Sequence, residues 1–192
     1  MKVVSLILIL CIVSVAQLKN TFTLSKGYAV TIQGTSNLHN WSETVEDVTG
    51  ESIISYNKDE TFDLENIYLK MSVHSIKSEM GSIMNDNTYK ALKADAHPMI
   101  IFKLTSPIAS IPIKSSKTIL ATGDLTIAGI TKCITMQVNV SILTKQKMTF
   151  IGSQPIKMSD YNVEPPTALL GTLKTGDEIT IHFNTTFTLN NH

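Results

Sequence analysis

The chain has 192 residues, too few for more than one ordinary domain, and its formal net charge at neutral pH is zero. All of its basic residues are lysines, and arginine, the usual bidentate ligand for phosphate groups, does not occur. The balanced charge and the lack of arginine argue against a nucleic acid as the partner.

The first 16 residues have the pattern of a secretory signal peptide. Lys2 gives a positive start, residues 3–15 are mostly apolar, and the small residues Ser14 and Ala16 fit a cleavage site. This stretch is too short to span a membrane stably, and we expect no membrane-spanning segment elsewhere. We therefore expect residues 1–16 to be removed, which leaves residues 17–192 as one periplasmic or secreted domain.

Alternation of apolar and polar residues dominates the chain from Thr23 onward and is typical of strands with one buried face. It predicts strands at residues 28–34, 41–56, 67–75, 99–104, 117–127, 131–143, 147–158 and 178–189. Gly129 gives the backbone freedom for a tight reversal between two of these strands.

Residues 85–94 depart from the alternation. They begin with Asn85, a residue type that caps helices, and continue with good helix formers. Tyr89 and Leu92 share one face, and Pro98 prevents continuation. We expect one short helix that acts as a lid or a plug.

About eight antiparallel strands with one helix predict either a barrel or a two-sheet sandwich. The interior of an eight-stranded barrel is either filled by side chains or large enough for one small ligand. The alternation shows an apolar lining but does not decide between these two interiors.

Three blocks of the chain carry a family resemblance. Residues 91–102 (ALKADAHPMIIF) form a helix-to-strand passage, residues 123–132 (GDLTIAGITK) form a hairpin, and residues 34–41 (GTSNLHNW) form an early bend. The second block is similar to the hairpin G-x-L-T-I-x-G-V-T-K of the YceI-like, polyisoprenoid-binding proteins of bacteria, and the first is similar to their helix-to-strand passage. The third block looks like the opening found in a Bacteroidetes-type branch of that family.

The resemblance implies an all-β fold, a single antiparallel eight-stranded lipocalin-like barrel with one short helix, exported to the periplasm. It also implies a long isoprenoid chain, such as a quinone tail, in the lumen, and homodimers occur in the family. A carrier for such a chain is physically reasonable. Each methylene gains about 0.8 kcal/mol of free energy when it is removed from water, so a long isoprenoid chain does not cross water unaided.

The candidate ligand-binding residues are the apolar and aromatic side chains expected to line the lumen. They are Trp41, Leu69, Met71, Val73, Tyr89, Leu92, Phe102, Leu125, Ile134, Met136, Val138, Met158, Ile181 and Phe183.

His39 is the candidate for contacting a ligand head group. In one interpretation His39 and Trp41 lie at the barrel mouth, where the indole stacks on a ligand ring and the imidazole bonds its oxygen. In the other, Trp41 packs on the rim of the core and His39 bonds a loop carbonyl.

Three hypotheses for function follow. The first is a non-enzymatic carrier of an apolar lipid, with no cofactor and no metal. The second is a barrel with a packed interior that acts through its surface or by dimerising, where Cys133 is either an exposed thiol or covered at a subunit contact. The third is a hydrolase or metal enzyme that uses His39, His74 or His182. No nucleophile elbow, phosphate loop, dinucleotide fingerprint or zinc-helix motif supports it.

Overall fold

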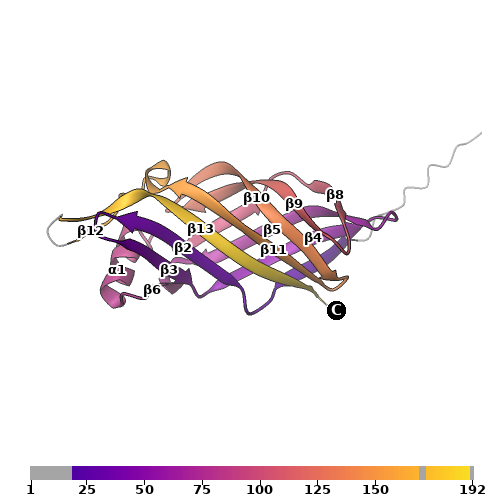
Figure 1. Ribbon diagram of the computed structural model, residues 1–192, viewed down its shortest axis with the longest axis horizontal. Helices are drawn as coiled ribbons and strands as arrows, with labels where there is room; N and C mark the ends of the chain where they lie inside the picture. The colour runs from indigo at the N-terminus through magenta and orange to yellow at the C-terminus, as the bar shows by residue number, and fades with distance from the viewer. Residues whose placement is uncertain (1–18, 169–171, 191–192) are drawn as a thin grey trace, which may run out of the picture.

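The computed structural model describes residues 19–168 and 172–190, and the signal peptide predicted at residues 1–16 lies outside them (Figure 1). The helical elements are η1 (Val73–Ser75), α1 (Ser82–Ala91) and η2 (Met158–Tyr161). The strands are β1 (Lys19–Leu24), β2 (Ala29–Ser36), β3 (Asn40–Val45), β4 (Val48–Tyr56), β5 (Thr61–Ser72), β6 (Ile76–Ser78), β7 (Met99–Leu104), β8 (Ile108–Pro112), β9 (Ser116–Ile127), β10 (Ile130–Thr144), β11 (Lys147–Lys157), β12 (Thr167–Ala168) and β13 (Leu173–Leu189).

Eight strands form a closed antiparallel barrel, in the order β1-β4-β5-β7-β9-β10-β11-β13. The barrel closes because β1 also pairs with the end of β13, where Phe22 lies opposite Leu189 and Leu24 opposite Phe187. The predicted eight-stranded antiparallel barrel with one short helix is therefore confirmed. Figure 1 shows that the barrel is elongated, with α1 near one end and β8 near the other.

The 17-residue strand β13 has two successive neighbours on one side. Its C-terminal end pairs with β1, and its N-terminal part pairs with β2, from Thr175 opposite Ser36 to Asn184 opposite Ala29. From β2 the sheet continues to β3 and the three-residue strand β6. The barrel wall is therefore extended at the α1 end by β2, β3 and β6.

The hairpin of β9 and β10 confirms the predicted alternation. The two strands pair from Ile130 opposite Ile127 to Ser141 opposite Ser116. The inward residues from Ile119 to Ile127 and from Ile134 to Ile142 are buried or half-buried, whereas Cys133 on the outer face is exposed. Ala128 and Gly129 make the turn, both with positive φ.

The single strand predicted at residues 41–56 is wrong, because the structure divides it into β3 and β4. The break falls at residues 46–47, where the Tyr28 hydroxyl donates to the carbonyl of Glu46 and accepts from the amide of Val48. Gly50 lies inside β4 opposite Leu69.

The predicted helix begins three residues too late. Asn85 does not cap α1; its side-chain Oδ1 accepts a hydrogen bond from the amide of Ser78 at 2.7 Å, and the helix begins after Gly81. The helix ends at Ala91 because Lys93 adopts a left-handed conformation with φ of 54°.

The strand predicted at residues 67–75 ends at Ser72, so the prediction is wrong for its last three residues. The chain turns there into η1, in which Val73 donates its amide proton to the carbonyl of Pro98 and the Ser75 hydroxyl donates to the carbonyl of Ser72. The alternation also missed β1, β6, β8 and β12, and it began β13 five residues too late.

Candidate functional site

Two apolar cavities lie inside the barrel, each with a volume of about 90 Å³. We call the first the barrel cavity; the polar side chains that line it, among the residues that the structure describes, are Gln154 and Thr185. We call the second the helix-end cavity; it is lined by residues of α1 and η2 together with the surrounding strands. Ile181 of β13 lines both, so the two cavities are neighbours along the lumen.

The barrel cavity contains most of the lining residues predicted from the sequence. They come from β5, β7, β9, β10 and β13, whose inward faces meet there. These residues are Leu69, Met71, Phe102, Leu125, Ile134, Met136, Val138, Ile181 and Phe183. Their role in ligand binding stays a prediction, but the structure brings their side chains together around one cavity.

Glycines on the inner face make room for the larger of these side chains. An added Cβ at Gly123 would come 2.5 Å from Cζ of Phe102, and one at Gly152 would come 2.6 Å from Cζ of Phe183. The bare backbone therefore lets both rings lie against the barrel wall instead of crossing the lumen. Gly34 under Trp41 and Gly50 under Leu69 repeat this arrangement.

The helix-end cavity also receives predicted residues, namely Trp41, Leu92, Met158 and Ile181. The indole of Trp41 lies over Gly34, and its Nε1 donates a hydrogen bond to the carbonyl of Thr35 at 3.1 Å. Trp41 therefore packs on the wall of the lumen, and its only indole proton is already bonded to the backbone.

Three predicted residues line neither cavity. Val73 is buried in η1, and Tyr89 points its hydroxyl at Lys77 and at the carbonyls of His74 and Ile76, which ties α1 to its neighbours. His39 lies exposed in the β2–β3 connection. The structure therefore does not bring these three to the lumen.

The helix-end cavity holds polar groups that the sequence analysis did not single out. Glu43 is only 5% exposed and accepts a hydrogen bond from the Thr88 hydroxyl at 2.7 Å. Burial raises the pKa of Glu43, and the Thr88 hydrogen bond lowers it to a smaller extent. Among the described residues, no ion pair involves Glu43.

Tyr161 of η2 completes this polar set. Its side chain is 2% exposed, and its hydroxyl is buried without a hydrogen-bond partner among the described residues. Burial raises the pKa of Tyr161, and the nearby charge of Asp160 adds to the effect. The short helix η2, which carries Tyr161, is tied to β13 because Asp177 accepts hydrogen bonds from the amide and hydroxyl of Ser159.

A signal for Glu43 was present in the sequence, but one for Tyr161 was not. Glu43 has the same strand parity as Trp41 and Val45, which places it on the inner face of β3. Tyr161 lies in a 3-10 helix of four residues, which is too short for its three-residue period to show in the sequence.

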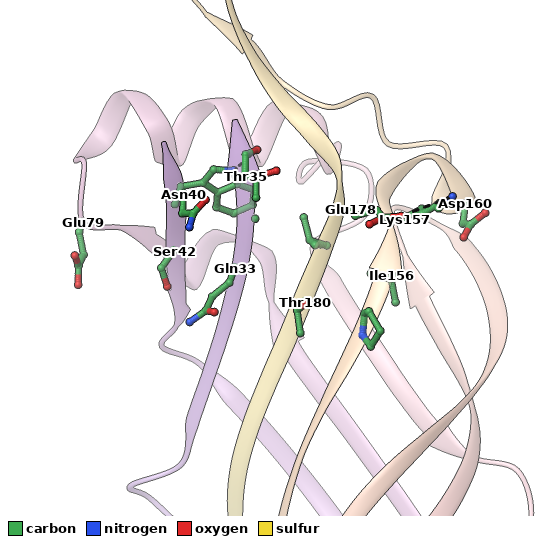
Figure 2. A pocket seen from close by; sticks show the side chains of 14 residues that line it. Gln33, Thr35, Asn40, Ser42, Glu79, Ile156, Lys157, Asp160, Glu178 and Thr180 are labelled. Atoms are coloured by element: carbon green, nitrogen blue, oxygen red, sulfur yellow. Dashed lines mark hydrogen bonds and ion pairs between the residues drawn. The ribbon is translucent and has the colours of Figure 1, made fainter. Parts of the chain in front are cut away.

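A wider concavity lies outside the barrel. Figure 2 shows it across β3, β2, β13 and β11, with polar side chains such as Gln33, Ser42 and Thr180, and its volume is about 860 Å³. Lys157 and Glu178 form an exposed ion pair there at 3.9 Å, typical of a solvated surface. Trp41, Ile156 and Ile179 line both this groove and the helix-end cavity, so they form the wall between the two.

The candidate catalytic histidines lie apart. His39 is in the β2–β3 connection, His74 is in η1 against the ring of Tyr89, and His182 is on β13. Within residues 19–168 and 172–190, no three His, Cys, Asp or Glu side chains converge as metal ligands would. Over the same residues, the structure contains no helix with the length and apolar character needed to cross a membrane.

A closed eight-stranded barrel around an apolar lumen defines the chain as a lipocalin-like barrel protein. The model of the YceI-like domain matches residues 17–187, and the chain therefore belongs to the YceI-like family. Its assignment to a Bacteroidetes-type branch stays a prediction. A search of curated proteins found no significant match.

Solved structures share the fold. A polyisoprenoid-binding domain from Saccharophagus degradans, implicated in plant cell wall breakdown, superposes with a TM-score of 0.70 at 13% identity, covering 88% of this chain and 98% of that one. BcnA of Burkholderia cenocepacia gives 0.61 at 20% identity, covering 83% and 95%. The YCEI protein of Campylobacter jejuni gives 0.57 at 17% identity, covering 78% and 85%.

Proposed function

We propose that this protein is an exported, non-enzymatic carrier that holds a long apolar lipid, an isoprenoid chain, inside its barrel. The observation that carries the proposal is the pair of adjoining, mostly apolar cavities, one inside the closed barrel and the other at its α1 end. The similar domain from Saccharophagus degradans is described as polyisoprenoid-binding, which supports the same ligand class here.

The dimensions of the lumen define how such a ligand enters. Cavities that bind small molecules usually measure about 300–1,000 Å³, whereas each cavity here measures about 90 Å³. A long chain therefore needs side chains of the lining to move. Met71 and Met136 suit this role, because the unbranched thioether side chain adapts its rotamers at low cost.

Export is part of the proposal. The N-terminal pattern of residues 1–16 supports it, since a carrier of membrane-derived lipid is useful in an aqueous compartment next to a membrane. A mature N-terminus at Gln17, measured by intact mass after expression with the native leader, is the expected result. Full-length protein retained inside the cell would contradict export and leave lipid binding to be judged separately.

Lipid binding is tested with the mature chain and the hydrocarbon farnesane, a saturated C15 isoprenoid. Trp41, the only tryptophan, lines the helix-end cavity and reports occupancy through its emission. We expect a saturable change in emission, and we expect organic extracts of the purified protein to contain an isoprenoid by mass spectrometry. An unchanged emission together with lipid-free extracts would refute the carrier function.

A matched pair of variants locates the binding. Ala121 lines the barrel cavity, and Ala121→Leu fills much of it, so farnesane affinity should fall by about tenfold. Gln137→Leu adds an apolar side chain on the exposed outer face of the adjacent strand β10 and should leave the affinity unchanged. Equal loss in both variants would place the binding site outside the lumen.

A further inference from the structure

The two cavities differ in how many polar side chains line them. Among the described residues, the barrel cavity is lined by Gln154 and Thr185, whereas the helix-end cavity is lined by Glu43, Asn87, Thr88, Tyr161 and Thr175. An apolar chain cannot form hydrogen bonds with these groups, and removing a polar group from water without a hydrogen-bond partner costs free energy. A ligand with an apolar tail and one polar end would match both parts of the lumen.

We propose that the helix-end cavity is a head-group site that selects a lipid with an uncharged hydroxyl end, an alcohol or a phenol, over one with an anionic phosphate end. This inference rests on the proposed carrier function and adds the chemical class of the ligand to it. The site consists of Glu43 of β3, Thr88 of α1 and Tyr161 of η2, and η2 is held to β13 through Asp177.

Tyr161 gives the first reason. Its hydroxyl is buried and unpartnered among the described residues, although nearly all buried polar groups in folded proteins find a hydrogen-bond partner. A ligand oxygen in the helix-end cavity would supply the missing partner. The left-handed residue Asn162 follows directly and ends the turn.

Glu43 gives the second reason, because it sets the sign of charge that the site accepts. Its buried carboxyl group lies in a cavity that no lysine of residues 19–168 and 172–190 lines, and the chain contains no arginine. A phosphate group there would meet a carboxyl group without any cation to balance it. An anionic head group is therefore disfavoured.

The combination of donors and acceptors gives the third reason. Glu43 accepts hydrogen bonds, and the Tyr161 hydroxyl can donate one. A ligand hydroxyl can pair with either group, since it can donate to a carboxyl group and can accept from a phenol. A lone carbonyl oxygen would serve Tyr161 only.

The test compares three probes of one chain length: farnesol, farnesyl phosphate and farnesane. Trp41 lines the same cavity and reports each titration. The wild-type protein should bind farnesol at least about tenfold more tightly than farnesyl phosphate. Farnesane measures the contribution of the tail alone.

Two variants separate the roles of the polar groups. Tyr161→Phe removes only the hydroxyl, and it should weaken farnesol binding about fivefold while changing farnesane binding less than twofold. Glu43→Gln keeps the size and the hydrogen-bonding capacity, so farnesol binding should persist while binding of farnesyl phosphate strengthens. Thermal unfolding of each variant checks that the barrel is intact.

The outcomes distinguish the inference from the carrier function. If farnesane binds but Tyr161→Phe weakens farnesol and farnesane equally, or if the wild type binds farnesyl phosphate as tightly as farnesol, the head-group site is refuted and the carrier function stands. If neither farnesane nor farnesol binds the wild-type protein, both proposals fail. Should Tyr161→Phe unfold, the Glu43→Gln comparison alone still decides the preference for an uncharged head group.

Discussion

The ring of Phe102 lies so close to the backbone of Gly123 that a Cβ at position 123 would come 2.5 Å from Cζ of the ring. The same Cβ would also come 2.6 Å from the backbone carbonyl oxygen of Lys103, which a change of rotamer cannot relieve. The pair therefore shows how the barrel holds a large aromatic residue and still keeps free space in its lumen.

Gly123→Ala should destabilise the barrel by about 1–3 kcal/mol, the usual cost of overpacking a core. The displaced Phe102 ring would also enter the barrel cavity, so the variant should bind farnesane more weakly. Urea unfolding and Trp41 titration measure the two effects. Thr118→Ala, on the exposed outer face of the same strand, is the control and should stay within about 0.5 kcal/mol. If Gly123→Ala were as stable as this control, the backbone of the barrel wall could shift to accept the added Cβ at little cost.

Gly34→Ala should change the surroundings of Trp41 more than the stability of the fold. The three atoms nearest to a Cβ at position 34 all belong to the indole side chain, so the indole would have to move. Because Trp41 forms part of the wall between the outer groove and the helix-end cavity, we expect a shifted emission maximum and stronger quenching by acrylamide. Ser42→Ala, exposed on the outer face of β3, should leave both unchanged. An unaltered spectrum in Gly34→Ala would show that the close contact does not fix the indole.

Glu43 should make stability fall as the pH rises. Burial raises the pKa of Glu43 in the folded state above its ordinary value of 4.5, so the unfolded chain loses this proton at a lower pH than the folded one. The contribution to stability is fully present below pH 4.5 and is lost as the pH rises through the raised pKa. Glu43→Gln should therefore be more stable than the wild type at pH 7, with an advantage that shrinks toward pH 4.

Urea unfolding of both proteins at a series of pH values measures this difference. The comparison cancels the other titrating groups, since they are common to the two chains. An advantage that stays constant between pH 4 and pH 7 would show that Glu43 titrates normally in the folded protein.

Asp177 should act in the opposite direction, at acid pH. Hydrogen bonds from the hydroxyl and amide of Ser159 lower the pKa of Asp177 below its ordinary value of 3.8, and the charge of Lys157 adds a smaller effect. Its contribution is present above pH 3.8 and is lost as the pH falls through the lowered pKa. Asp177→Asn should therefore lose less stability on acidification than the wild type does.

The contact between Ser159 and Asp177 is tested further by a double-mutant cycle. Ser159→Ala and Asp177→Asn should be non-additive, because both remove the same hydrogen bond. Glu178→Gln, at the exposed neighbouring position, should be additive with Ser159→Ala. Additivity in both pairs would mean that η2 is held in place by other contacts.

The sequence predicted well the elements whose pattern repeats. In β9 and β10 the alternation extends over a dozen paired residues, so parity alone identifies the inward side chains, Leu125 and Met136 among them. The alternation failed to predict where strands end and the chain bends. The break at residues 46–47 depends on the Tyr28 hydroxyl, 18 to 20 residues away along the chain, and η1 depends on the carbonyl of Pro98. Such contacts leave no local pattern.

The candidate site divides in the same way. The apolar lining of the barrel cavity follows from strand parity, but the polar end depends on tertiary packing that brings α1 and η2 over β3. Strand β1 was missed because only Phe22 of its six residues is fully buried, so its sequence resembles a polar loop. It forms a strand because β4 and β13 supply partners on both of its sides.

The two successive neighbours of β13 also make the two ends of the barrel unequal in local stability. At the end that contains β1, the strand hydrogen bonds continue all the way around the barrel. Toward α1 the sheet ends at β6, which pairs with β3 over three residues only. Within the described residues, α1 buries none of its side chains fully, so little apolar packing holds it there. Amide protons of α1 and β6 should therefore exchange with solvent well before those of β9 and β10. The end of the lumen that more polar side chains line is then also the end whose backbone hydrogen bonds break first in local unfolding.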